Sequence, residues 1–363
     1  MTDQLLAIGT RKGLFLARSG DDRSTWELDG PHFPAHAVYS IAVDTRRDPA
    51  RVLAGTHSEH WGPTVFRSDD LGRRWQETEG GAVRFSAGSG GALQRVWQLR
   101  PGPADQPDVV WAGAEPGSLF RSDDGGATFS LVHGLWNHPH RPKWEPGGGG
   151  QCLHTIVLHP TDPDRLLVAI STGGVYRSSD GGATWAPSNA GIGAGHLPDP
   201  QPEYGQCVHK VAAHPERPEQ LFLQNHGGVY RSDDGGATWL PIEDGLPAVF
   251  GFPVVTHPHR PGTAYLYPLV SDEHRIPPDA RVRVYRTADA GESWEPLTEG
   301  LPQIHAFSTV LRDAMTTDDA TPAGVYFGTR TGDVFASRDE GDTWSAVANF
   351  LPDVLVVRAA TLA

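Results

Sequence analysis

Residues 231–239 read RSDDGGATW, and residues 177–185 read RSSDGGATW, nearly the same nine residues about 54 positions earlier. Four more copies and one decayed copy follow the pattern Ser/Thr-x-Asp-x-Gly-x-Thr-aromatic: RSDDLGRRW at 67–75, RSDDGGATF at 121–129, RTADAGESW at 286–294, ASRDEGDTW at 336–344, and RSGDDRSTW at 18–26. Self-similarity at a nearly fixed period is the sequence signature of a repeat architecture. The repeat therefore has to be explained before any single residue is given a role.

Each copy, called a box below, has the composition of a hairpin turn. The Asp carboxylate can accept backbone N–H groups across the turn, and Gly supplies the positive φ that other residues resist. The terminal Trp or Phe is expected to pack into the sheet beneath. The first two copies depart from the pattern, with Arg23 at the Gly position and Arg74 at the Thr position, so looser turns are expected there.

The segment before each box predicts strands. Residues 154–178 divide into strands at 154–158, 165–170 and 174–178, and a short strand follows the box from 184. Four antiparallel strands per repeat of about 50 residues make a propeller blade. Seven boxes therefore predict an all-β, seven-bladed β-propeller, with residues 1–363 as a single domain.

The two ends of the chain are predicted to share one blade. Residues 5–26 are expected to supply its last three strands, and VLVVRAATL at 354–362 its missing first strand. Such sharing would pair strand edges that are otherwise left open.

The boxes resemble the Asp-box, or bacterial neuraminidase repeat, of sialidases, xyloglucan-degrading enzymes, sortilin-type receptors and a photosystem II assembly factor. The resemblance covers the whole chain and implies the fold, whereas activity is carried by sites grafted on a fold. It also implies that the boxes lie on the face opposite the active site. Function is therefore expected on the other end of the propeller, called the top face below.

The amino-acid composition limits the classes of partner that the protein is expected to bind. Lys and Arg total 30 against 44 Asp and Glu, a net charge of −14, which disfavours nucleic acid and anionic membranes. The N-terminus has no basic segment followed by a long apolar run, so we expect a soluble, cytoplasmic protein. Cys152 and Cys207 are expected to be buried thiols rather than a disulfide.

Long connections are expected on three adjacent blades of the top face, at about 76–93, 130–151 and 186–206. They predict a lopsided pocket beside the channel. Within the loop 137–154, the run Gly147 to Gly150 would let backbone approach a ligand and Trp144 could stack on it; a flexible hinge is the alternative.

The inner strands predict a ring of side chains around the upper channel. Aligning these strands on the His-Pro that follows them brings five residues to one level: Tyr39, Arg95, His154, His209 and Phe252. All but the last are predicted to bind the ligand.

The pair Cys-x-His occurs twice, as Cys152/His154 and Cys207/His209. Four such ligands could satisfy tetrahedral zinc. Quasi-rotational symmetry argues against it, because equivalent residues of adjacent blades point the same way around the ring and converge poorly. Further histidines predicted on this face are His57, His60 and His226. We predict no metal and no cofactor, with hydrogen-bonded histidines as the simpler interpretation.

A sialidase would need three arginines that clamp a carboxylate, together with a Tyr activated by Glu. GTRKG and GTRTG place Arg11 and Arg330 at equivalent turns of neighbouring blades, with Arg95 near the channel; Tyr39, or Tyr204 beside Glu203, could be the phenol. The chain departs from sialidases of this type, which have six blades and an Arg-Ile-Pro near the N-terminus, whereas here Arg-Ile-Pro is at 275–277.

A general glycosidase needs two carboxylates at a defined separation. The predicted catalytic acids on the top face are Glu59, Glu115 and Glu203, with Asp272 and Glu273 as further acids, and Trp61, Trp97 and Trp136 could stack on sugar rings.

Two functions remain open at this point. The first is a sialidase-like or glycosyl-hydrolase-like propeller that binds a small polar or carbohydrate ligand on the top face, either with or without hydrolysing it. The second is a non-catalytic propeller that presents this face to a protein partner.

Overall fold

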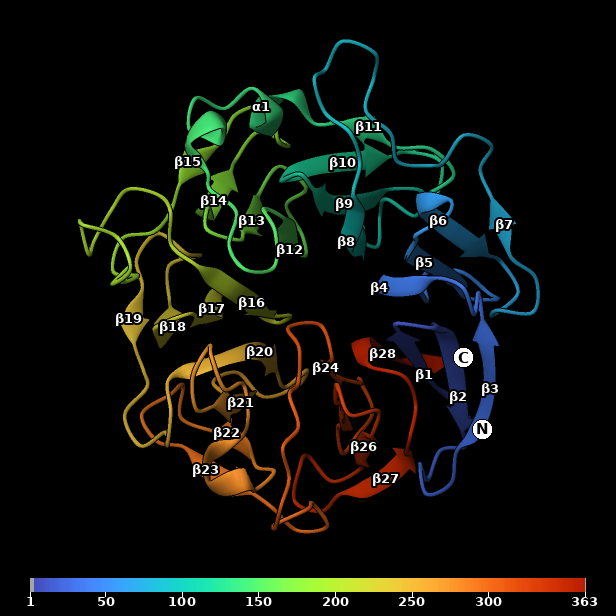
Figure 1. Ribbon diagram of the computed structural model, residues 1–363, viewed down its shortest axis with the longest axis vertical. Coiled ribbons are helices and arrows are strands. Elements are labelled where there is room, and N and C mark those ends of the chain that lie inside the picture. The colour runs from blue at the N-terminus through green and yellow to red at the C-terminus, as the bar shows by residue number, and fades with distance from the viewer. Residues whose placement is uncertain (1–2, 363) are drawn as a thin grey trace.

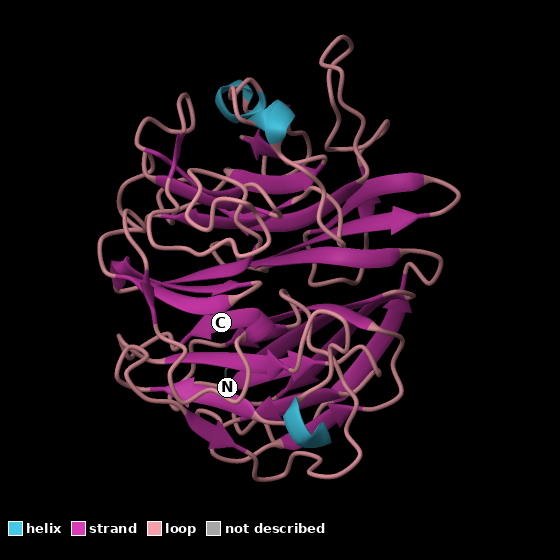
Figure 2. Ribbon diagram, turned by 60° about the vertical axis from the view of Figure 1, so that its left-hand side comes forward, coloured by secondary structure: helices cyan, strands magenta, loops and turns pink. Residues whose placement is uncertain are grey.

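The computed structural model describes residues 3–362 as seven four-stranded antiparallel sheets arranged around a central channel (Figure 1). This confirms the seven-bladed propeller. Nearly all of the regular secondary structure is strand, and the helical segments are short and lie in connections (Figure 2).

The blades are numbered here from the N-terminus. Blade 1 has β1 (Asp3–Thr10), β2 (Gly13–Ser19), β3 (Glu27–His32) and β28 (Val354–Leu362); blade 2 has β4 (Ala37–Asp44), β5 (Arg51–Ser58), β6 (Gly62–Ser68) and β7 (Gln76–Glu77). Blade 3 has β8 (Arg95–Pro101), β9 (Val110–Glu115), β10 (Ser118–Ser122) and β11 (Ser130–Leu131); blade 4 has β12 (Leu153–Leu158), β13 (Leu166–Ile170), β14 (Gly174–Ser178) and β15 (Ala186–Pro187).

Blade 5 has β16 (Val208–His214), β17 (Arg217–Asn225), β18 (Gly228–Ser232) and β19 (Leu240–Pro241); blade 6 has β20 (Phe250–Thr256), β21 (Ala264–Leu269), β22 (Val284–Thr287) and β23 (Glu295–Leu297). Blade 7 has β24 (Met315–Thr317), β25 (Val325–Gly328), β26 (Val334–Ser337) and β27 (Ser345–Ala348). The helical segments are α1 (His133–Trp136) and two 3₁₀ turns, Arg141–Lys143 and Pro278–Ala280. Within residues 3–362, no helix has the length and apolar character needed to span a bilayer.

Blade 1 closes the ring as predicted. β28 pairs with β1 in antiparallel register from Asp3↔Leu362 to Thr10↔Val354. The predicted bounds 5–26 were too short, because the fourth strand of this blade, β3, begins only at Glu27, after the box.

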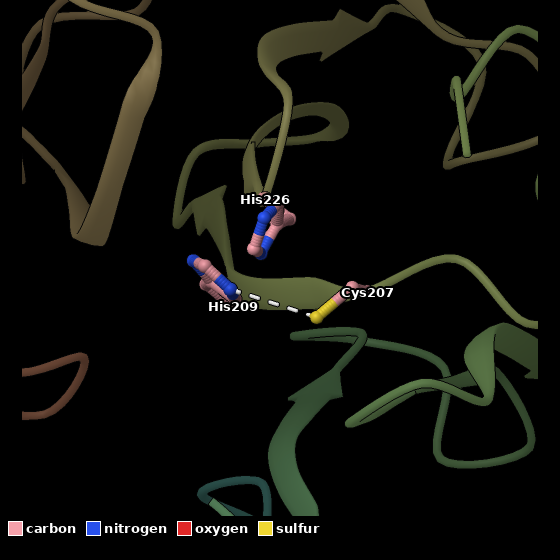
Figure 3. Close-up of side chains that lie close together, drawn as sticks. All are labelled: Cys207, His209 and His226. Carbon is pink, nitrogen blue, oxygen red and sulfur yellow. Dashed lines mark hydrogen bonds between the residues drawn. The ribbon is translucent and has the colours of Figure 1, made fainter. Parts of the chain in front are cut away.

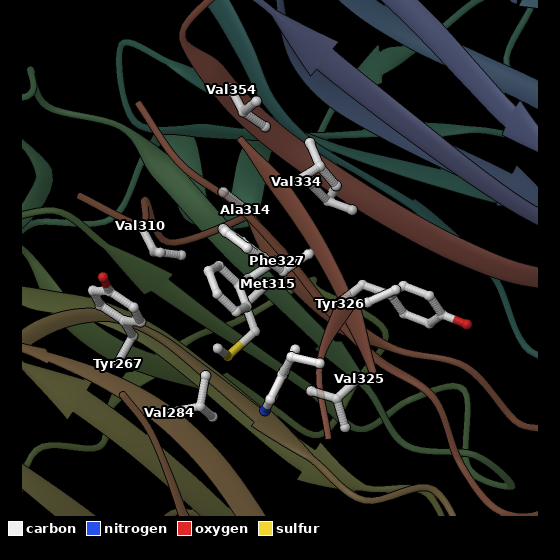
Figure 4. Packing of buried hydrophobic residues seen from close by; sticks show 14 of the residues in the cluster. Tyr267, Val284, Val310, Ala314, Met315, Val325, Tyr326, Phe327, Val334 and Val354 are labelled. Carbon is white, nitrogen blue, oxygen red and sulfur yellow. The ribbon is translucent and has the colours of Figure 1, made fainter. Parts of the chain in front are cut away.

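Apolar side chains fill the space between neighbouring blades. In the largest cluster, Tyr267 and Val284 of blade 6 meet Met315 and Phe327 of blade 7 (Figure 4). The inner strands thus stand rigidly around the channel, which fixes the residues at their ends.

The boxes join the third and fourth strands of each blade. In the blade 5 box, Ser232 Oγ donates to Asp234 Oδ1 at 2.8 Å and accepts the Gly236 N–H at 2.8 Å, while Thr238 donates its N–H and hydroxyl to the two Asp234 oxygens. Gly236 has φ of 85°, and the terminal Trp239 is 2% exposed. The carboxylate therefore locks the turn from inside, as predicted.

The expectation of looser turns holds for the first copy only. There Ser19 Oγ is buried without a partner, and Arg23, at φ 50°, sends its guanidinium into blade 7 to Asp318 at 3.0 Å. The expectation was wrong for the second copy, because the Arg74 backbone N–H still donates to Asp70 at 2.8 Å and needs no Thr side chain to do so.

Candidate functional site

A cavity of about 730 Å³ occupies the end of the channel opposite the boxes. Its floor and inner wall come from the heads of inner strands, and its rim comes from top-face connections, including the glycine loop Gly147 to Gly149. The predicted position of the pocket, beside the channel on the top face, agrees with this cavity.

A repeated β-bulge aims side chains at the cavity. Near its head, each of five inner strands carries one residue more than its partner strand: Tyr39, Trp97, His154, His209 and Leu355. Phe252 lies in a similar irregularity of β20, and Arg312 lies just before β24. A bulge bends the strand and re-aims the extra side chain, and such bulges are common next to active sites. All of these residues except His154 line the cavity.

The predicted ring was wrong in blade 3. Arg95 lies two residues before the bulge and pairs with Glu115 across the strand, and its Nη1 is 2.8 Å from Glu115 Oε2. Trp97 occupies the ring position, and its indole N–H donates to the same oxygen at 2.9 Å. Neither Arg95 nor Glu115 lines the cavity, and each neutralises the charge of the other.

Two further predicted ligand-binding residues are held in the interior. Trp144 packs in a hydrophobic cluster, and its indole N–H donates to Tyr176 Oη at 2.9 Å. His154 is fully buried, donates Nε2–H to the Val208 carbonyl at 2.9 Å and accepts from Thr155 at Nδ1. Both side chains stabilise blade junctions and do not reach the cavity.

The remaining predicted acids, Glu59 and Glu203, are exposed and are not among the cavity-lining residues. The carboxylates that do line the cavity are Glu145, Asp272 and Asp313. Asp313 is buried and bound by Lys210 Nζ at 2.7 Å and by Arg358. Burial, which favours the neutral acid, is outweighed by these two cations, and the pKa of Asp313 is lowered.

The structure brings Arg11 and Arg330 together at the cavity rim. Both approach Asp353, at 3.6 Å and 2.8 Å respectively. Asp353 thus pairs with both arginines, and Arg95 lies outside the cavity. The three-arginine clamp considered from the sequence is therefore not assembled.

Two other arginines face the cavity with no carboxylate partner among residues 3–362. Arg312 Nη1 donates to Cys152 Sγ at 3.4 Å and its guanidinium lies 5.4 Å from the Trp97 ring centre. Arg275 Nε donates to the Asp272 carbonyl at 2.8 Å and lies 5.5 Å from the Phe252 ring centre. The glycine loop crosses above them, since a Cβ added at Gly148 or Gly149 would lie 3.9 Å from an Nη2 of Arg275 or Arg312.

Sequence reasoning missed Arg312. The His-Pro used to align inner strands is absent from blade 7, where the strand reads LRDAMTTDD. Counting back from the boxes does not replace this anchor, because Tyr39, His209 and Arg312 lie 29, 23 and 25 residues before the serine of the next box.

Cys207, His209 and His226 form a cluster on the cavity wall (Figure 3). One ligand atom from each lies within 4.8 Å of the others, and Cys207 Sγ is 3.7 Å from His209 Nε2. Burial lowers the pKa of His209 to about 3, so its ring is neutral at physiological pH. Cys152 and His154 do not join this cluster, in agreement with the symmetry argument.

Comparison with known proteins relates the chain distantly to xyloglucanases. No family model matches. The chain is 27% identical over 288 residues to a xyloglucanase of Hypocrea jecorina, which covers 72% of this chain and 32% of that protein. It is 26% identical over 221 residues to an oligoxyloglucan-reducing end-specific xyloglucanase of Emericella nidulans, which covers 58% and 26%. The chain thus spans about a third or less of the length of these relatives.

Solved structures with this fold include an ancestral GH74 enzyme, with a TM-score of 0.58 at 15% identity over 86% of this chain and 38% of that chain. YCF48 bound to D1 peptide matches with a TM-score of 0.52 at 15% identity, over 86% and 82% of the two chains. These likenesses establish the fold. The chain is therefore a seven-bladed Asp-box propeller with distant homology to GH74 xyloglucanases.

Proposed function

We propose that this protein binds a small carbohydrate that carries a carboxylate or another anionic group, in the top-face cavity. The observation that carries this proposal is the charge of the cavity. Its lining has five basic residues, Arg11, Lys143, Arg275, Arg312 and Arg330, against the three acids named above, in a chain of net charge −14.

Arg275 and Arg312 are the two cavity-lining arginines without a carboxylate partner among residues 3–362, so both are available to bind the anionic group. A guanidinium presents a planar set of donors that matches a carboxylate or phosphate. Both are partly buried beneath the glycine loop, so an ion pair with a ligand would be screened less than one on the open surface.

The aromatic residues of the ring suit the rest of such a ligand. Tyr39, Trp97 and Phe252 present rings at the cavity floor and inner wall. Small-molecule sites typically combine an apolar and aromatic lining with a few placed polar groups. Distant homology to xyloglucanases supports a carbohydrate as the ligand class.

Binding is the function proposed, and hydrolysis is its extension. Asp313 is occupied by two cations, so Glu145 and Asp272 are the cavity-lining carboxylates available as an acid and base pair. If the protein hydrolyses its ligand, Asp272→Asn should abolish turnover while binding persists.

Calorimetric titration with matched sugars tests the proposal. Uronic acids and N-acetylneuraminate should bind, whereas the neutral sugars should bind at least about tenfold more weakly. Arg312→Gln and Arg275→Gln should each remove that preference. Arg73→Gln, an exposed arginine in a box, is the matched control and should change nothing. Equal affinity for neutral and acidic sugars, or unchanged binding by Arg312→Gln, would overturn the proposal.

A second candidate function is the docking of a polypeptide on the top-face rim. Among residues 3–362, six of the eight exposed large apolar residues lie in top-face connections: Trp61, Val249, Val270, Ile304, Phe307 and Phe350. Phe350 is 94% exposed, and Ile304 is 77% exposed. Exposed apolar groups concentrated on one face favour a binding surface.

Rim variants separate the two functions. Replacing Ile304, Phe307 and Phe350 by Ser should abolish binding of a purified partner identified by cross-linking and leave sugar titrations unchanged. Loss of sugar binding in the rim variant, with the partner still bound, would refute this division of the face.

A further inference from the structure

We propose that Cys207 Sγ, His209 Nε2 and a ring nitrogen of His226 bind one zinc ion on the cavity wall, with a fourth coordination position open to the cavity. Metal binding at this site would be independent of which sugar the cavity takes.

The three side chains come from a single blade. Cys207 and His209 flank the first residue of β16, and the bulge at His209 turns its ring toward the same side as Cys207. His226 lies in the tight turn between β17 and β18 at the top of the same blade. The symmetry argument against zinc applies to ligands from adjacent blades, so it does not apply to this set.

The distances fit zinc coordination. Tetrahedral geometry with Zn–S of about 2.3 Å and Zn–N of about 2.05 Å separates sulfur from nitrogen by about 3.6 Å. Cys207 Sγ and His209 Nε2 are 3.7 Å apart, and the third ligand atom lies within 4.8 Å of both. A rotation of the His226 side chain, which is only half-buried, would bring its nitrogen to coordinating distance.

A hydrogen bond fixes the His209 ring in the form that binds metal. Nδ1–H donates to the Gly251 carbonyl at 2.6 Å, which leaves the Nε2 lone pair directed toward Cys207. Metal-binding histidines typically donate their other ring N–H to such an acceptor. Phe252 stacks on the same ring at 4.9 Å, so the ligand is held before any ion arrives.

The ligand atoms of this site favour zinc over calcium and magnesium. One thiolate and two imidazoles suit zinc, whereas calcium and magnesium prefer oxygen ligands. Three protein ligands with an open position are typical of catalytic rather than structural zinc. Asp272 Oδ2, 3.7 Å from His226 Nε2, lies beside the cluster and can orient that ring.

Blade 4 offers an internal control. It carries the equivalent Cys152 and His154, but its turn between the second and third strands reads Ser171-Thr172-Gly173 and has no histidine. His154 also uses both ring nitrogens in hydrogen bonds. We therefore expect no metal at blade 4.

The test uses untagged, full-length protein loaded with zinc or cobalt and then dialysed. We expect one metal per chain by elemental analysis, and a sulfur-to-cobalt charge-transfer band in the near ultraviolet. Cys207→Ser should remove the band. His226→Gln should weaken zinc by at least the roughly tenfold to 100-fold that loss of a supporting group costs. Cys152→Ser, and His196→Gln beside the cluster, are matched controls and should behave as wild type.

Several outcomes would overturn the proposal. These are the absence of stoichiometric zinc in folded protein, a cobalt spectrum without the thiolate band, or zinc binding that Cys207→Ser and His226→Gln leave unchanged. Because the readout is metal content and spectrum, it is independent of whether any sugar binds.

Discussion

Single residues in the boxes stabilise turns and take no part in binding. Asp234 accepts three hydrogen bonds within its own turn, from Ser232 and Thr238, on the face opposite the cavity. Asp234→Ala should lower the free energy of unfolding by about 1–3 kcal/mol and leave ligand affinity unchanged. Urea unfolding and calorimetry check this, with the neighbouring Asp233→Ala as control. A folded Asp234→Ala protein that lost only binding would place function on the box face.

The same carboxylates should make stability sensitive to acid. Hydrogen bonds from the Thr184 hydroxyl and N–H lower the pKa of Asp180 to about 2, and that from the Ser293 hydroxyl, with further bonds, lowers the pKa of Asp289 to about 2. Because these folded pKa values lie below the unfolded value of 3.8, the stabilisation is complete above about pH 5 and is lost as pH falls toward 2. Asp180→Asn should flatten the change in unfolding free energy between pH 5 and 3, as urea titrations at each pH would measure. A slope equal to wild type would contradict this account.

At the scale of elements, the bulges of the inner strands determine which side chains face the cavity. Tyr39 and His209 reach the cavity because each is the extra residue of a bulge near the head of an inner strand. The sequence predicted this ring from the repeat, since equivalent positions of a propeller face the same channel. It misplaced Arg95 because blade 3 has no His-Pro after its inner strand, so the alignment had no true anchor there. Which ring members are neutralised, as Arg95 is by Glu115, depends on contacts between strands that periodicity does not contain.

The glycine loop is the element that should control access of anions to Arg312. Gly149 has ordinary backbone torsion, and an added Cβ would meet only the Arg312 guanidinium at 3.9 Å. Gly149→Glu should therefore pair with Arg312 and weaken an anionic ligand by at least about tenfold without lowering the melting temperature. Gly195→Glu, on another top-face loop with open space around it, is the control. Equal affinities of the two variants would exclude the loop from the site.

At the scale of the whole molecule, the sequence contained the fold and very little of the site. The seven boxes predict seven blades. The strand at 354–362, which follows the last box, predicts how the ring closes, and both predictions are confirmed. Net charge did not indicate the charge of the cavity, where basic residues outnumber acidic ones although the chain has a net charge of −14. The basic lining of the cavity comes from loops of different blades that meet in space. Local sequence patterns do not contain this information.

Closure of the ring depends on the C-terminal strand. β28 supplies the innermost strand of blade 1, and most of its side chains are buried between blades 7 and 2. Deleting residues 354–363 would expose the edge of β1, open the apolar clusters on both sides and remove Arg358 from Asp313. We expect the melting temperature to fall by more than about 10 °C. A synthetic peptide of residues 354–363 added in excess should restore part of the loss by binding the folded state. An unchanged melting curve after truncation would show that the propeller does not depend on this strand, and recovery with a scrambled peptide would show that the rescue is not strand pairing.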